Sequence, residues 1–195
     1  MIIVAGGDSF VWGSELADSP HGGTDGYSRN TFAALLAGPK YVCAAYPGIG
    51  NKEIVYRTKA VLKTLQSVMV DEPIGVIVCW SWQSRDNQLD SDAEIIELQT
   101  HLNNLNIPYL FTCVDNCVVT HNPLIDYSKW FLFPVIPNSG WHPNDNPRGF
   151  YQWALEHKYE LAQKDKHPLE PAHRDAVQLM KDKFNELVTK HLQQN

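Results

Sequence analysis

The chain opens with the stretch MIIVAGGDSF, residues Met1 to Phe10. Within it, residues 2–5 form a short apolar run that ends at two glycines, a pattern typical of a buried β-strand followed by a turn. In a parallel α/β sheet, ligands bind beyond the carboxyl ends of the strands. The sequence therefore predicts a strand at the very start and places Ser9 directly after it, at the edge of a sheet where chemistry is expected.

Farther along, apolar runs alternate with amphipathic stretches, which is typical of βαβ units. The expected strands are 2–5, 41–45, 74–79 and 109–114, and the expected helices are 28–37, 51–70, 91–104 and a last one from near Pro168 or Glu170. Asn51 is expected to cap the second helix, and Ser91 to Glu94 has the form of a capping box. The pattern predicts an α/β fold of three α/β/α layers around a mainly parallel sheet.

Neither a repeat nor a low-complexity linker divides the sequence, so residues 1–195 are interpreted as one domain. The alternation weakens in residues 116–166, where aromatic residues are mixed with Pro and Gly. A structureless loop of that length would be unusual in a compact domain. This segment is therefore expected to contain short helices or to act as a cap over a site.

The composition narrows the classes of partner. The formal net charge is −6 and no long run of Lys or Arg occurs, so a nucleic acid is not an expected partner. No apolar stretch is long enough to cross a bilayer, and no basic leader precedes the first strand, so the default location is cytoplasmic. The four cysteines do not suggest a disulfide framework, since three of them fall in or at the end of expected strands.

The spacing of two cysteines and a histidine raises the question of a metal site. Cys113, Cys117 and His121 lie four residues apart and would share a face if that segment were helical. Structural zinc sites normally have four ligands, and no fourth is evident here. Core packing is the preferred interpretation, and no metal is expected.

Three short motifs lie where chemistry could occur. Ser9 follows the first strand, Gly48 lies in a glycine turn after the second, and His167 in Asp165-Lys166-His167-Pro168 precedes the last helix. Taken singly, each is typical of a turn, an ordinary loop or a helix start. Taken in order, they fit a nucleophile, a backbone donor to an oxyanion and a general base.

These motifs resemble those of the SGNH (GDSL-type) hydrolase superfamily along nearly the whole chain. Gly7-Asp8-Ser9 with the following Trp12-Gly13-Ser14-Glu15-Leu16 resembles block I, Gly48 resembles the block II glycine, and His167-Pro168 resembles block V. The resemblance implies a flavodoxin-like sandwich, no metal and no organic cofactor. It also implies a serine esterase or deacylase that acts through an acyl-enzyme, on a small-molecule or glycan ester.

Two blocks depart from the family pattern. Block III normally carries an Asn that donates to the oxyanion, whereas this chain has Cys79-Trp80-Ser81-Trp82-Gln83-Ser84-Arg85, similar to a divergent, virus-like branch. Ser81, Gln83 or Arg85 is expected to supply the third donor beside Ser9 and Gly48, and Gln83 is the one named for it. In block V the family has Asp three residues before His, whereas Asp165 lies two before His167. Asp165 is expected to orient the base, or a backbone carbonyl takes that part.

Ser81, Arg85 and Asn51 are the expected substrate-binding residues. The missing block III Asn leaves open a catalytically weakened or inactive module that binds a glycan or a protein partner. A flavodoxin-like binder of nucleotide or FMN is a second alternative, but its phosphate loop should lack the bulky side chains of Phe10, Val11 and Trp12. His21 and His142 are weaker candidates for the site, both expected in loops.

Overall fold

The computed structural model describes residues 1–19, 26–69, 72–86, 90–135 and 147–194. Its sheet has four parallel strands in the order β2-β1-β3-β4, namely β1 (Ile2–Gly6), β2 (Tyr41–Cys43), β3 (Ile74–Trp80) and β4 (Tyr109–Cys113). The α-helices are α1 (Ser9–Trp12), α2 (Phe32–Ala37), α3 (Asn51–Val68), α4 (Asp92–Asn104), α5 (Phe150–Glu156) and α6 (Glu170–Gln194). The predicted α/β class with a mainly parallel sheet is confirmed.

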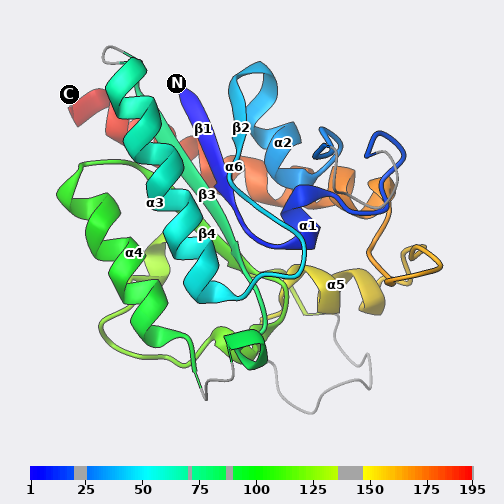
Figure 1. Ribbon diagram of the computed structural model, residues 1–195. Coiled ribbons are helices and arrows are strands. Elements are labelled where there is room, and N and C mark those ends of the chain that lie inside the picture. Colours follow the sequence, from blue (N-terminus) through cyan, green and yellow to red (C-terminus); the bar gives the residue numbers. More distant parts are fainter. Residues whose placement is uncertain (20–25, 70–71, 87–89, 136–146, 195) are drawn as a thin grey trace.

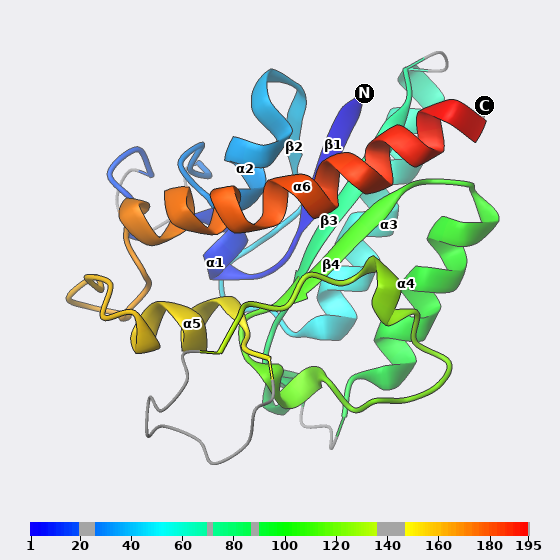
Figure 2. The same cartoon turned by 180° about the vertical axis from the view of Figure 1, so that it is seen from behind.

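Helices cover both faces of this sheet. Figure 1 shows α3 and α4 in front of the strands, and Figure 2, from behind, shows α6 lying across the other face with α2 beside it. Each layer has its own buried cluster, because successive side chains of a strand point to opposite faces. Ile3 and Ala5 of β1 belong to the cluster under α2 and α6, whereas Ile2 and Val4 belong to the one under α3 and α4.

The strand order places a reversal of connection direction beside β1. The chain runs from β1 outward to β2, then crosses back to β3 on the other side of β1. Loops that leave β1 and β3 therefore diverge at the carboxyl edge, and such a switch point is where open α/β sheets bind ligands. Ser9 follows β1 and Ser81 follows β3, so both lie at this edge.

One expected helix start and one expected helix cap differ from the structure. The helix expected over 28–37 begins only at Phe32, because the side chain of Thr31 accepts a hydrogen bond from the backbone N–H of Ala34 and caps it there. Helix α4 begins beside Ser91 as expected, but the hydroxyl of Ser91 caps nothing and instead accepts from Asn51 Nδ2 at 2.7 Å. The predicted capping box is therefore wrong, although the boundary that it predicted is right.

In the aromatic-rich segment, the described residues form short elements. They are the 3-10 helices η4 (Asn116–Val118) and η5 (Tyr127–Lys129) and the helix α5, while residues 136–146 lie outside the described residues. Several of the aromatic side chains pack under α6, with Phe133, Phe150 and Trp153 fully or almost fully buried. Among the described residues, no helix is both long and apolar enough to cross a membrane.

Candidate active site

Ser9 is the first residue of the one-turn helix α1, an element that the sequence did not predict. Asp8 caps this turn, since its carboxylate accepts a hydrogen bond from the backbone N–H of Phe10 at 3.1 Å. Gly13 ends it in the left-handed conformation with φ 80°. The turn holds Ser9 at the carboxyl end of β1, where its side chain is nearly buried, with 6% exposure for the residue.

His167 lies in a tight loop that precedes α6. A bridge pairs Leu161 with Pro168, and the N–H of Ala162 donates to the carbonyl of His167 at 2.8 Å. Lys166, the residue before the histidine, has a φ of 60°, in a region that residues other than glycine seldom adopt. Non-glycine residues in this region cluster at functional sites, where the surrounding structure holds them.

The structure brings Ser9 and His167 together. The Oγ of Ser9 lies 2.8 Å from Nε2 of His167, although the two residues are 158 positions apart in the sequence. The ring of Phe10 packs edge-on against the imidazole, with 4.9 Å between centroids. Phe10 in turn contacts Trp82 and Tyr151, so the histidine lies against one ring of a small aromatic cluster.

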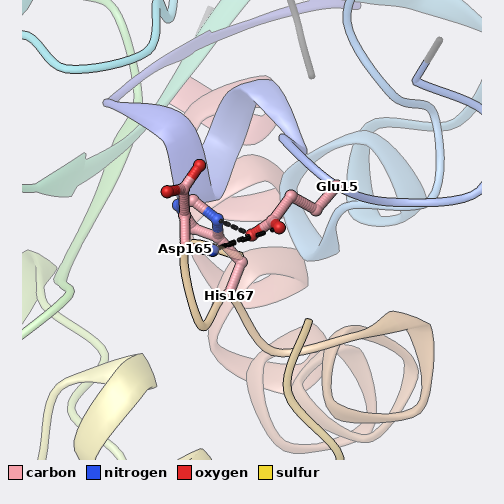
Figure 3. A group of neighbouring side chains, drawn as sticks. All are labelled: Glu15, Asp165 and His167. Atoms are coloured by element: carbon pink, nitrogen blue, oxygen red, sulfur yellow. Dashed lines mark hydrogen bonds and ion pairs between the residues drawn. The ribbon is translucent and has the colours of Figure 1, made fainter. Parts of the chain in front are cut away.

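The other ring nitrogen of His167 contacts a residue that the sequence did not single out. Nδ1 lies 2.7 Å from Oε2 of Glu15, and the backbone N–H of Asp165 donates to both oxygens of the same carboxylate at 3.2 Å. Figure 3 shows these bonds converging on Glu15, whereas the carboxylate of Asp165 points away from them. The place expected for Asp165 beside the ring is therefore occupied by Glu15, because the loop after α1 folds back onto the histidine loop.

The surroundings of Glu15 favour its charged form. Burial raises the pKa of its carboxyl group, but the hydrogen bonds from His167 and from the Asp165 N–H, with the charge of a protonated His167, oppose that effect. The net result is a pKa below the usual value. Glu15 is therefore ionised at neutral pH and accepts the hydrogen bond from Nδ1 of the histidine.

Asp8, Ser81 and Arg85 form a polar network beside Ser9. The hydroxyl of Ser81 donates to Oδ2 of Asp8 at 2.6 Å, and a guanidinium nitrogen of Arg85 lies 3.6 Å from the same oxygen. Burial raises the pKa of Asp8, and Arg85, Ser81 and the Phe10 N–H oppose this only in part. Ser81 is fully buried and its hydroxyl is engaged, whereas the Arg85 side chain is 26% exposed and also packs over Trp82.

Asn51 is fully buried and joins three elements. Its Oδ1 accepts from the N–H of Ser81 at 2.8 Å, while its Nδ2 donates to the carbonyl of Ser81 and to the hydroxyl of Ser91. The sequence predicted that Asn51 caps α3, but its side chain makes no such bond. Asp86 does so from outside the helix, since its carboxylate accepts from the backbone N–H groups of Asn51 and Lys52.

The two remaining oxyanion candidates lie at the same edge of the sheet. Gly48 is exposed in the turn between β2 and α3. Gln83 lies in the 3-10 helix η3 (Gln83–Asp86) after β3, and among the described residues its buried Oε1 has no hydrogen-bond partner. The weaker candidates His21 and His142 lie outside the described residues.

His173, on the first turns of α6, lies behind His167. Its Nδ1 accepts from the backbone N–H of Phe32 at 3.1 Å, and its ring packs against those of Phe32 and Phe150. Burial, and to a smaller extent the nearby His167, lowers the pKa of His173 to about 3. A hydrogen bond to the backbone of Pro168 opposes this shift. His173 therefore stays neutral and links α6, α2 and the residue after His167.

One group of metal-ligand type occurs among the described residues, and it coincides with this site. Oxygen atoms of Glu15 and Asp165 and a ring nitrogen of His167 lie within 4.8 Å of one another. The closest pair in it, Glu15 and Nδ1, is already joined by a hydrogen bond. Of the residues in the spacing weighed for zinc, Cys113 is fully buried at the end of β4, whereas Cys117 and His121 are exposed.

Comparison with known proteins gives a likeness in fold. No protein-family model matches the chain, and no curated protein matches it in sequence. Among solved structures, the chain is similar to the crystal structure of the psychrotrophic esterase EstA from Pseudoalteromonas sp., inhibited by monoethylphosphonate. The TM-score is 0.49 and the identity 13%, over 98% of each chain.

Proposed function

We propose that this protein is a serine ester hydrolase of the SGNH type, with Ser9 as nucleophile and His167 as general base. The contact of 2.8 Å between Ser9 Oγ and His167 Nε2 carries the proposal, because a nucleophile and its base must lie within hydrogen-bond reach. The position of Ser9 at the carboxyl edge of the sheet supports it.

In the proposed reaction, Ser9 Oγ attacks the ester carbonyl while its proton passes to His167 Nε2. The imidazolium then gives that proton to the departing alkoxide, so that the alcohol leaves and an acyl-enzyme remains. Water then attacks the acyl group and gives a proton to His167 Nε2. The imidazolium returns that proton to Ser9 Oγ as the bond between the acyl carbon and this oxygen breaks, and the carboxylic acid leaves. Both halves use the same Oγ–Nε2 geometry.

The backbone N–H groups of Ser9 and Gly48 are the proposed donors to the oxyanion, with the Gln83 side chain as the proposed third. Ser81 is a poor candidate for that third place, because its hydroxyl is bonded to Asp8 and its N–H to Asn51. Arg85, partly exposed beside Trp82, is the proposed contact for a polar part of the substrate. The partly exposed rings of Trp82 and Tyr151, which pack on the buried Phe10, suit an apolar or sugar face next to the ester.

The first prediction concerns the nucleophile and its base. The wild-type protein is expected to hydrolyse short p-nitrophenyl esters and to become labelled by a fluorophosphonate probe. Ser9→Ala should abolish labelling and lower kcat by a factor on the order of 10⁴ or more. His167→Ala should lower turnover on the same order, because the serine then keeps its proton.

Matched variants control for effects on folding. Ser14→Ala makes the same change in the same segment, at a buried hydroxyl that has no hydrogen-bond partner among the described residues, and should keep activity and labelling. His157→Ala, at an exposed histidine, is the control for His167. The hydrolase proposal would be refuted if the wild-type protein neither reacted with the probe nor hydrolysed any ester. Glycan binding of equal strength in wild type and Ser9→Ala would then favour a binding module.

A further inference from the structure

Glu15 shares one imidazole with the nucleophile. His167 stands between Ser9 Oγ at 2.8 Å from Nε2 and Glu15 Oε2 at 2.7 Å from Nδ1. Since a neutral imidazole carries one N–H, an ionised acceptor at Nδ1 keeps the proton on that nitrogen. Nε2 is then left with the lone pair that must accept the proton of Ser9.

The carboxylate is held in place from several directions. The N–H of Asp165 donates to both carboxylate oxygens of Glu15, and the Glu15 side chain is only 13% exposed. Glu15 itself has a φ of 69°, which a residue with a side chain adopts only when its surroundings enforce it. Two residues on, the N–H of Ala17 donates to Oε1 of Glu170 at the start of α6 at 2.7 Å. The segment after α1 is thus tied to both ends of the histidine loop.

Asp165 is poorly placed for the same task. It contributes its backbone N–H to Glu15, but its side chain is 54% exposed, lies 3.9 Å from Lys164 Nζ and points away from the bonded carboxylate in Figure 3. In water, such a group orients an imidazole weakly, because solvent competes for the hydrogen bond. The family pattern, in which the acid stands in the histidine block, does not describe this geometry.

We propose that Glu15, carried by the same segment as the nucleophile, is the residue that positions His167 and stabilises its protonated form, and that the Asp165 side chain has no part in this. The proposal rests on the proposed ester hydrolysis. It makes the acidic member of the triad a glutamate six residues after Ser9, with the base 152 residues away from it. The block V carboxylate is replaced by a backbone N–H that holds the acid.

The test compares four variants in steady-state ester hydrolysis across pH. Glu15→Gln is expected to lower kcat by roughly 10²- to 10⁴-fold with little change in KM, because an amide can donate to Nδ1 and favour the wrong tautomer. Its acidic limb of kcat/KM should move to lower pH, because no negative charge then favours the imidazolium. Glu15→Asp keeps the charge and should recover part of the lost kcat.

Asp165→Asn and Glu170→Gln are the matched controls. The first removes the exposed carboxylate charge beside the same ring. The second makes the same Glu-to-Gln change at the residue that accepts from the Ala17 N–H, where the amide oxygen can still accept, and it does not touch His167. Both should keep kcat within about threefold of wild type and leave the pH profile in place. Full activity of Glu15→Gln, or an equal loss in Glu15→Gln and Glu170→Gln, would overturn the assignment and leave Glu15 a loop anchor at most.

A readout independent of turnover separates this proposal from the proposed function. A downfield proton resonance from the imidazole N–H at Nδ1 is expected in wild type and in Ser9→Ala, and should be lost in Glu15→Gln. If ester hydrolysis is never seen but this resonance behaves as described, the hydrolase proposal fails while the pairing stands. The opposite outcome is an active enzyme whose activity is abolished by Asp165→Asn but not by Glu15→Gln. In that case the hydrolase proposal stands and only the present inference fails.

Discussion

Asp8 and Glu15 lie in the same N-terminal segment, yet their pKa values shift in opposite directions. Asp8 is fully buried, and burial raises its pKa more than Arg85, Ser81 and the Phe10 N–H lower it. For Glu15, burial is outweighed by the hydrogen bonds from His167 and Asp165. Pairs of carboxyl groups separated in this way divide their tasks by environment. Here Asp8 shapes the turn that carries Ser9, and Glu15 keeps the charge that faces the imidazole.

His173 gives a prediction for the pH dependence of stability. In the folded protein its pKa is lowered to about 3, chiefly by burial, whereas an unfolded histidine has a pKa of about 6.5. Between these values the unfolded chain takes up a proton that the folded chain refuses, so stability falls as pH falls below about 6.5. By linkage, the loss at pH 5 is about 2 kcal/mol from this group alone.

The measurement is urea denaturation of wild type and His173→Gln at pH 7 and pH 5. Glutamine keeps an acceptor for the N–H of Phe32 but does not titrate, and the other groups contribute equally to both proteins. The stability advantage of wild type over the variant should therefore shrink by about 2 kcal/mol between the two pH values. An advantage that stays constant would show that His173 is not buried in its neutral form.

At the scale of elements, α1 is a single turn whose shape depends on its ends. A side chain at Gly13 would be strained at φ 80°, and its Cβ would lie 2.3 Å from Cβ of Ser28. Ser28 in turn is tied to Asp18 by a hydrogen bond between side chains, so it cannot easily move away. The segment between Ser9 and Glu15 is thus packed against the loop that precedes α2.

Gly13→Ala is therefore expected to reduce both stability and activity. Gly38→Ala is the control for backbone strain without a clash, because Gly38 has φ 66° and ψ −142°, which residues other than glycine seldom adopt, while its Cβ would meet nothing within 4 Å. The control should lose about 1–3 kcal/mol in urea denaturation but keep kcat. Gly13→Ala adds the clash with Ser28 in the segment that carries Ser9, so it should lose stability and also lower kcat. Full activity in both variants would show that the turn tolerates displacement.

At the scale of the whole molecule, α6 closes the core over one face of the sheet and begins three residues after His167. Its inward side chains Ala172, Ala176 and Met180 are fully buried against the cluster that contains Phe32 and Phe150. The position of His167 thus depends on the packing of a helix that runs across the molecule (Figure 2).

Met180→Ala tests this packing. Removing a fully buried Met is expected to cost about 2–5 kcal/mol through lost burial and the cavity left behind. Leu179→Ala, at the preceding position with the residue 40% exposed, should stay within about 0.5 kcal/mol of wild type. Chemical denaturation gives both values. A loss for Met180→Ala no larger than that for Leu179→Ala would mean that α6 is not packed on the sheet as described.

The sequence by itself determined the α/β class and most element boundaries. Periodicity of apolar residues is a local property, so α3, β3 and β4 begin where they were expected. The ordered motifs also brought forward Ser9 and His167, which the structure places 2.8 Å apart. Their catalytic roles stay predictions until the variants are measured.

Only the tertiary structure decided which side chains meet across loops. Glu15 rather than Asp165 bonds to the ring of His167. Asp86 rather than Asn51 caps α3. The hydroxyl of Ser91 accepts from Asn51 and does not cap its own helix. Each of these bonds joins residues at least 35 positions apart, or diverts a group from a local partner to a distant one. Spacing along the chain says which groups are near in sequence, whereas a hydrogen bond depends on where two loops come to lie once the sheet and its helices have packed.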